Sequence, residues 1–200
     1  MARSLNHFDL IARHYDRLSG KAGHALLPAI VDARAGDLLL DVGGGTGRVA
    51  EALRNAGATV IVCDRSLEML RRARAKGLPC VQAAARRLPF ADQRFDRVLA
   101  VDAFHHFAWP TAAEAQPLAA EQMLRVLAPR GRVVIGEPDI RATGVKLIAL
   151  VEKLLLMHSR ILAPEPLSEL FHAAGAERVL ARDDDFSVWL VFQPGSRPDP

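Results

Sequence analysis

A glycine-rich turn between a predicted strand and a predicted helix is the feature that most constrains this chain. Residues 38–50 read Leu-Leu-Leu-Asp-Val-Gly-Gly-Gly-Thr-Gly-Arg-Val-Ala. The apolar run that closes on Asp41 predicts a buried parallel strand, and the pattern after Gly47 predicts a helix. Glycines tolerate positive φ and let a ligand approach the backbone, towards which the free N–H groups of a helix N-terminus point. The layout indicates an α/β fold with a ligand site at this turn.

The spacing of the glycines narrows the kind of ligand. A dinucleotide fingerprint, G-x-G-x-x-G, places its third glycine five positions after the first. Here the glycines fall at Gly43, Gly45 and Gly47, and position 48 is Arg. The pattern is therefore D-x-G-x-G-x-G, which speaks against a nicotinamide site. Taken alone, the turn is compatible both with a ligand site and with a purely structural role.

A second acid strengthens the ligand interpretation. Residues 59–63 form a β-branched apolar run that closes on Asp64. An acid about 20 residues beyond a glycine turn, at the end of the next strand, is placed to accept hydrogen bonds from ribose hydroxyls. Ser66 is a predicted N-cap of the following helix. Met69 on that helix is compatible with a position in the core.

The alternation of strands and helices predicts a Rossmann-like, doubly wound sheet of seven mostly parallel strands with helices on both faces. The predicted strands are 38–42, 59–63, 79–82, 95–101, 132–136, 176–182 and 186–192, and the main helices are 46–56, 66–76, 112–127 and 143–161, with a short helix from Pro164 to Ala174. We expect one domain over 1–193, with an N-terminal helical cap at about 5–33, a helical insertion at about 143–174 and a disordered tail at 194–200. Polar residues at the strand ends, Asp102 and Glu137 among them, would meet the glycine turn at one edge.

Composition excludes several classes of protein. The chain has 200 residues, half of them hydrophobic, and a net charge of +3 that is too small to argue for nucleic acid. No run of 18 uncharged apolar residues exists, so no stable membrane insertion is expected. The N-terminus does not resemble a signal peptide. Cys63 and Cys80 are expected to be reduced, which favours a cytoplasmic protein.

Several segments together resemble the class I S-adenosylmethionine (SAM)-dependent methyltransferases, and within them the ubiquinone/menaquinone-biosynthesis methyltransferase (type 11) family. The segments are 8–16, with Tyr15; the glycine turn 41–47; Asp64; Leu88-Pro89-Phe90 with Phe95-Asp96; 103–107; and 125–132. The resemblance covers about residues 5–137. It implies SAM as cofactor, S-adenosylhomocysteine as product and a small, apolar or aromatic methyl acceptor.

The resemblance also implies which residues hold the cofactor. They are Tyr15, Asp41, Gly43, Gly44, Gly45, Gly47, Asp64, Arg65, Met69, Ala84, Ala85 and Val101. One departure concerns the adenine, because Ala84 stands where the family often carries an acid. The adenine would then be held by backbone groups and apolar packing. The quinone-enzyme signature of the C-terminal third is also missing.

Methyl transfer from a sulfonium needs alignment and exclusion of water, and a general base only for some acceptors. His105 and His106 follow the fourth strand, on the side where the acceptor should enter, and Asp102 is the other polar group there. These three are the candidate catalytic residues. Each histidine could instead be a packing or capping residue. The scattered His, Glu and Asp residues do not form a zinc spacing, so no metal is expected.

The predicted helix 143–161 is apolar on most faces. Three interpretations remain open: a lid over a hydrophobic acceptor, the interface of a homodimer, or core. The function has two rivals. One is a SAM-binding regulatory or assembly module without turnover, and the other is a nicotinamide oxidoreductase, which the Gly47 spacing disfavours.

Overall fold

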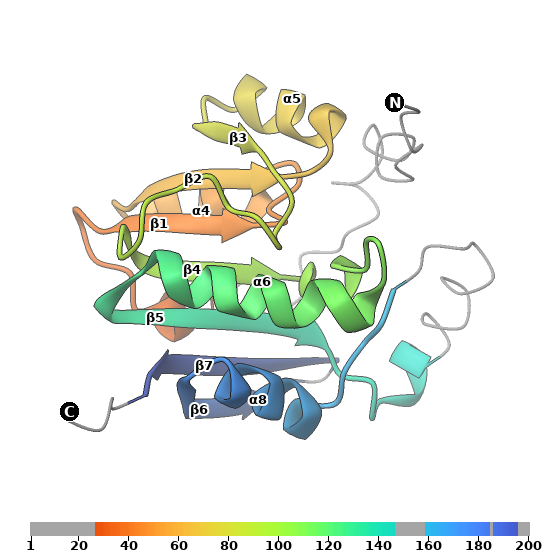
Figure 1. Cartoon of the computed structure of the whole chain (residues 1–200). Coiled ribbons are helices and arrows are strands. Elements are labelled where there is room, and N and C mark those ends of the chain that lie inside the picture. Colours follow the sequence, from red (N-terminus) through yellow and green to blue (C-terminus); the bar gives the residue numbers. More distant parts are fainter. Residues whose placement is uncertain (1–26, 147–158, 185, 196–200) are drawn as a thin grey trace.

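The computed structural model describes residues 27–146, 159–184 and 186–195. One seven-stranded sheet, with the order β3-β2-β1-β4-β5-β7-β6, forms the centre of the molecule (Figure 1). The strands are β1 (Leu38–Val42), β2 (Thr59–Asp64), β3 (Cys80–Gln82), β4 (Phe95–Val101), β5 (Leu127–Pro138), β6 (Ala176–Asp183) and β7 (Ser187–Pro194). β1 to β5 pair in parallel, whereas β7 runs antiparallel to β5 and to β6. The predicted Rossmann-like α/β fold with a mostly parallel sheet is confirmed.

Helices cover both faces of the sheet (Figure 1). They are α3 (Leu27–Val31), α4 (Arg48–Asn55), α5 (Leu67–Ala75), α6 (Ala112–Val126) and α8 (Pro164–Ala173), with a 3₁₀ turn η1 (Phe104–His106) after β4. Side chains of α6 and α8 share one buried apolar cluster with the sheet, and those of α3, α4 and α5 share another. The central strands of the sheet are therefore buried on both faces, as their continuous apolar runs require, whereas the edge strand β6 is exposed beyond Ala176.

A chain of aromatic contacts joins the C-terminal part of the sheet to the segment after β4. The rings of Phe171 on α8 and Phe192 on β7 stack with centroids 4.5 Å apart. Phe171 also contacts Phe104, with centroids 5.5 Å apart, and Phe104 contacts Phe107 at 5.3 Å. These rings hold η1 rigidly against α8 and β7.

The element bounds differ from the sequence expectations at a few places. β5 begins at Leu127, five residues before the predicted start, because Leu127 pairs with Phe95 before the register shifts and Arg132 pairs with Arg97. Residues 129–131 thus lie in a bulge within the strand. β7 extends to Pro194, so the predicted tail boundary was one residue too early.

The end of the predicted helix 143–161 was wrong, since residues 159–161 are not helical. Residues 143–146 are helical, and 147–158 lie outside the described residues. Most of the predicted N-terminal cap, including Tyr15, and residues 196–200 also lie outside them. Across 27–146, 159–184 and 186–195, no helix is long and apolar enough to cross a bilayer.

Candidate active site

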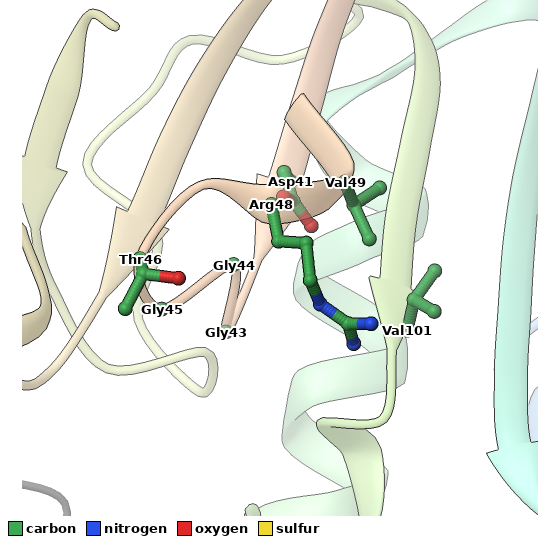
Figure 2. Close-up of a pocket in the computed structure, with 8 residues that line it drawn as sticks. All are labelled: Asp41, Gly43, Gly44, Gly45, Thr46, Arg48, Val49 and Val101. Atoms are coloured by element: carbon green, nitrogen blue, oxygen red, sulfur yellow. The ribbon is translucent and has the colours of Figure 1, made fainter. Parts of the chain in front are cut away.

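The carboxyl ends of the parallel strands bring the predicted polar groups to one edge of the sheet. Val42 pairs with Cys63, and Val101 pairs with Gly136. The segments that follow β1, β2, β4 and β5 therefore leave the sheet at the same edge. A pocket lies over the first of these turns (Figure 2). It is lined by Asp41, Gly43, Gly44, Gly45, Thr46, Arg48, Val49 and Val101. Four of the predicted glycine-turn residues and Val101 therefore surround one opening.

The four glycines of the turn serve different purposes. Gly43, Gly45 and Gly47 have φ of 74°, 54° and 76°, the left-handed region that other residues rarely adopt. A Cβ at Gly43 would meet Ala103 at 2.7 Å, and one at Gly47 would collide with Leu78. A Cβ at Gly44 would collide with the carboxylate of Asp41.

Gly45 differs from its neighbours because a Cβ there would meet nothing closer than the sulfur of Met69, at 3.9 Å. The open space at Gly45 lies in the pocket rather than in the core. The turn is therefore tightly packed on its protein side and open on its pocket side, which is what close approach of a ligand to the backbone requires.

Asp64 is hydrogen-bonded to the glycine turn. Its Oδ2 accepts a hydrogen bond from the Gly45 N–H at 2.9 Å, and its Oδ1 accepts one from the Ser66 N–H at 2.7 Å. Ser66 in turn caps α5, since its hydroxyl accepts from the Met69 N–H at 3.1 Å. Asp64 therefore links the glycine turn to the start of α5.

Asp41 is a buried acid beneath the turn. Its side chain is 1% exposed, and burial, followed by the negative charge of Asp64, raises its pKa to about 7. Arg48 and the Ala50 N–H oppose this shift. In the described part of the chain its Oδ2 has no hydrogen-bond partner. Such an acceptor next to a pocket suits a ligand that carries a positive charge.

Arg48 connects the first and fourth strand ends. Figure 2 shows its side chain extending from α4 towards Val101. Its Nη2 donates to Oδ2 of Asp102 at 3.3 Å. Asp102 has a φ of 51°, and burial and then the charge of Glu137 raise its pKa. Arg48 was not among the predicted site residues, although a charged side chain directly after the last glycine of the turn could have indicated it.

Glu137 organises the segment after β4. This carboxylate is 2% exposed and accepts hydrogen bonds from the backbone N–H groups of Ala103 at 3.1 Å, Phe104 at 2.9 Å and His105 at 3.0 Å. Its Oε2 also lies 2.7 Å from Nδ1 of His105. Glu137 therefore fixes both the backbone of η1 and the ring of His105.

The two predicted histidines lie together but in different environments. Their ring centroids are 3.9 Å apart. His105 is 3% exposed and is oriented by Glu137, whereas His106 is partly exposed. Burial, followed by the charge of His105, holds the pKa of His106 well below 6.5. His106 is thus a neutral imidazole at physiological pH.

The remaining predicted cofactor residues lie around the same edge. Met69 is buried on α5 with its sulfur facing Gly45. Ala84 and Ala85 are partly buried in the turn after β3, next to Ala83, whose N–H donates to the Asp64 carbonyl at 3.1 Å. Arg65 is exposed, with its guanidinium 5.4 Å from the Trp109 ring centroid. Within the described residues, no three His, Cys, Asp or Glu side chains gather as a metal site.

Comparison with known proteins agrees with this geometry. Residues 40–135 match the family model of a methyltransferase domain. The demethylmenaquinone methyltransferase of Thermobifida fusca is 38% identical over 144 residues, which cover 65% of this chain and 58% of that protein. A probable tRNA methyltransferase 9B of Mus musculus is 30% identical over 128 residues, which cover 64% of this chain and 28% of that protein. The chain thus spans about half, or less, of the length of these relatives.

Among solved structures, the fold is similar to that of a putative methyltransferase in a complex with a methyltransferase activator from Haloferax volcanii. The TM-score is 0.79 at 21% identity, over 96% of this chain and all of that one. This similarity concerns the fold. The sequence match therefore identifies residues 40–135 as a methyltransferase domain.

Proposed function

We propose that this protein is an enzyme that transfers a methyl group from SAM to a small apolar or aromatic acceptor. The observation that carries the proposal is the hydrogen bond between Gly45 and Asp64, at 2.9 Å, beside a turn whose open side faces a pocket. One extended ligand could therefore contact the backbone of the turn with one half and the Asp64 carboxylate with the other. Asp64 would accept from the ribose hydroxyls, and Gly43 to Gly45 would lie against the amino-acid part.

The charges of the residues at this turn suit SAM. SAM supplies an electrophilic methyl group on a positively charged sulfur. Asp41 and Asp64 give the site two acids close to the glycine turn, and the buried Oδ2 of Asp41 has no hydrogen-bond partner among the described residues. A cationic ligand would favour the ionised form of Asp41, whose pKa is otherwise raised to about 7. Met69, Ala84 and Ala85 would pack near the adenine, as the resemblance implies.

The groups available for proton transfer differ in their suitability. His105 is a positioning residue in this proposal, because its Nδ1 is held by Glu137 and its side chain is buried. His106 and Asp102 are partly exposed and could contact an acceptor. A neutral His106 can accept a hydrogen bond from an acceptor hydroxyl, but its lowered pKa makes it a weak base, so alignment would contribute most of the rate.

The similarity to demethylmenaquinone methyltransferases supports a small aromatic acceptor, and the free thiols of Cys63 and Cys80 support a cytoplasmic location. A homodimer through 143–161 stays a prediction, since most of that range lies outside the described residues.

The test of the proposed function is an acceptor screen. The protein is incubated with methyl-labelled SAM and with quinols, phenols and a transcribed tRNA in parallel, and label in each product is measured. Transfer to a quinol or phenol supports the proposal. Transfer to tRNA alone would mean that the acceptor is a nucleic acid and not a small molecule. Binding of SAM without transfer to any of these compounds would favour a SAM-binding regulatory or assembly module.

A further inference from the structure

A side-chain cluster beside the proposed cofactor site combines two arginines with one exposed tryptophan. The guanidinium carbon of Arg65 lies 5.4 Å from the ring centroid of Trp109, and that of Arg86 lies 5.0 Å from it. The three residues follow β2, β3 and β4 respectively, so the cluster lies at the same edge of the sheet as the glycine turn. Trp109 is 51% exposed.

Hydrogen bonds between side chains and backbone, and within the backbone, hold the segments that carry this cluster. The Gln82 side chain donates to the carbonyl of Arg65 at 3.1 Å, and the N–H of Arg87 donates to the carbonyl of Ala84 at 2.9 Å. Trp109 precedes the N-cap of α6, where the hydroxyl of Thr111 accepts from the Glu114 N–H at 3.3 Å. The cluster is therefore built on ordered turns and a capped helix.

The charges of the cluster are not balanced by acids. In the described ranges, no ion pair involves Arg65 or Arg86, and the Nε of Arg86 is buried without an acceptor. Other arginines differ: Arg125 contacts Asp92 and Arg141 contacts Asp139 and Asp183. Two like charges at one ring repel each other, and an oxyanion would relieve this repulsion.

The geometry also leaves donors for such an anion. A guanidinium that lies over an aromatic ring keeps N–H groups at its edge for hydrogen bonds, so cation–π contact and anion binding are compatible. The exposed half of Trp109 offers an apolar surface next to these donors. The combination matches a ligand in which a flat apolar ring carries an oxyanion.

We propose that Arg65, Arg86 and Trp109 form a subsite for an aromatic oxyanion, in which a carboxylate or phosphate of the acceptor meets the two guanidinium groups and its ring contacts Trp109. In this subsite the Arg65 guanidinium contacts the acceptor, whereas the resemblance implied a contact with the cofactor. The assignment of this ligand as the methyl acceptor rests on the proposed function. The subsite would make the enzyme select anionic aromatic acceptors over neutral ones of the same shape.

The test uses the two tryptophans of the chain as probes. Trp189 is 2% exposed, so the indole N–H signals of Trp109 and Trp189 in a ¹⁵N-labelled sample report an exposed and a buried site. The full chain, without cofactor, is titrated with 4-hydroxybenzoate, phenyl phosphate, phenol and inorganic phosphate at low salt. We expect the Trp109 signal to move and at least one aromatic anion to bind about tenfold more tightly than phenol or inorganic phosphate.

Two variants distinguish a specific binding site from nonspecific electrostatic attraction of the anion. Arg86→Gln should abolish the preference for the aromatic anion. Arg87→Gln removes the same charge from the adjacent exposed residue and should keep the preference. Equal loss in both variants, equal binding of phenol and 4-hydroxybenzoate, or an unmoved Trp109 signal would each overturn the subsite. The relative affinities of the carboxylate and the phosphate identify which oxyanion the site takes.

A single-stranded RNA hexamer is titrated in parallel. Tighter binding of the hexamer than of both aromatic anions would overturn the proposal in favour of a nucleic-acid contact. Because these titrations contain no SAM, their failure leaves the proposed methyltransferase activity untouched, and failure of SAM to bind leaves the anion subsite untouched.

Discussion

The backbone N–H of Gly45 donates to Oδ2 of Asp64 at 2.9 Å, so the turn after β1 and the acid at the end of β2 form one unit. The two residues are 19 positions apart in the sequence, and the parallel pairing of β1 with β2 brings them together. Asp64 thereby orients the most open residue of the turn. Any ligand that contacts both groups depends on this bond.

Replacing Asp64 tests its role in the binding of the cofactor ribose. Asp64→Ala should weaken binding of SAM and S-adenosylhomocysteine by about tenfold or more, since hydrogen bonds to a charged group contribute about 1.5–3 kcal/mol. Calorimetric titration measures both affinities. Glu121→Ala, an exposed acid on α6, is the control and should bind both compounds as the wild type does. Unchanged affinity in Asp64→Ala would mean that the ribose lies elsewhere.

Gly45→Ala tests whether the open side of the turn receives the ligand. The strain of a non-glycine residue at φ 54° should lower stability by about 1 kcal/mol, and the new methyl group should obstruct the pocket. Gly36→Ala is the matched control, because Gly36 also has positive φ, at 91°, and has nothing within 4 Å of its Cβ position. Both variants should melt at similarly reduced temperatures, but only Gly45→Ala should lose affinity for SAM. Equal affinity in the two variants would contradict the assignment.

The buried Asp41 makes stability depend on pH. Its pKa is about 7 in the folded protein and near 3.8 when unfolded, so the folded state binds the additional proton between these values. The free energy of unfolding should therefore fall as pH rises from about 4 to 7, by up to about 4 kcal/mol from this group. Asp41→Asn removes the ionisation, and its free energy of unfolding should lack this decline. Urea unfolding at pH 5 and pH 8 measures how the free energy of unfolding changes with pH in the wild type and in Asp41→Asn. An equal change in the two proteins would show that Asp41 is not the group responsible.

Glu137→Ala tests the carboxylate that organises η1. The change leaves three buried backbone N–H groups and the His105 ring without their acceptor, so unfolding should become easier by about 3–5 kcal/mol. Glu137→Gln keeps the shape of the side chain but places an amide N–H against the backbone N–H donors of η1. We expect it to lower the free energy of unfolding by less than Glu137→Ala does. Urea unfolding measures both variants against Glu121→Ala. If Glu137→Ala lowers the free energy of unfolding by less than about 1 kcal/mol, water replaces the carboxylate as the hydrogen-bond acceptor.

The sequence was most informative where local pattern and fold agree. β1 and β4 have the predicted bounds, because each is a short apolar run between a turn and a polar residue. Ser66 is an N-cap as predicted, since a hydroxyl before an apolar helix has one favourable partner, the N–H of Met69. The early start of β5 depends on pairing between Leu127 and Phe95, a long-range contact that no local pattern encodes.

The position of the glycine turn could be predicted from the sequence, but most of the side-chain contacts of the site could not. The acids and glycines of the turn follow a fixed spacing, whereas the bond from Arg48 to Asp102 joins residues 54 positions apart. Similarly, nothing in the sequence distinguishes His105, which is held by Glu137, from the neighbouring His106. Such contacts depend on which strand ends become neighbours, and the sheet order decides that.

The most direct test of the central claim is calorimetric titration of the wild-type chain with SAM, S-adenosylhomocysteine and NADH. Binding only to the native state also raises the melting temperature, which gives an independent check. We predict that both adenosyl compounds bind with micromolar affinity and that NADH does not bind. Binding of NADH in place of SAM, or no binding of either adenosyl compound, would contradict it and leave the glycine turn a structural feature.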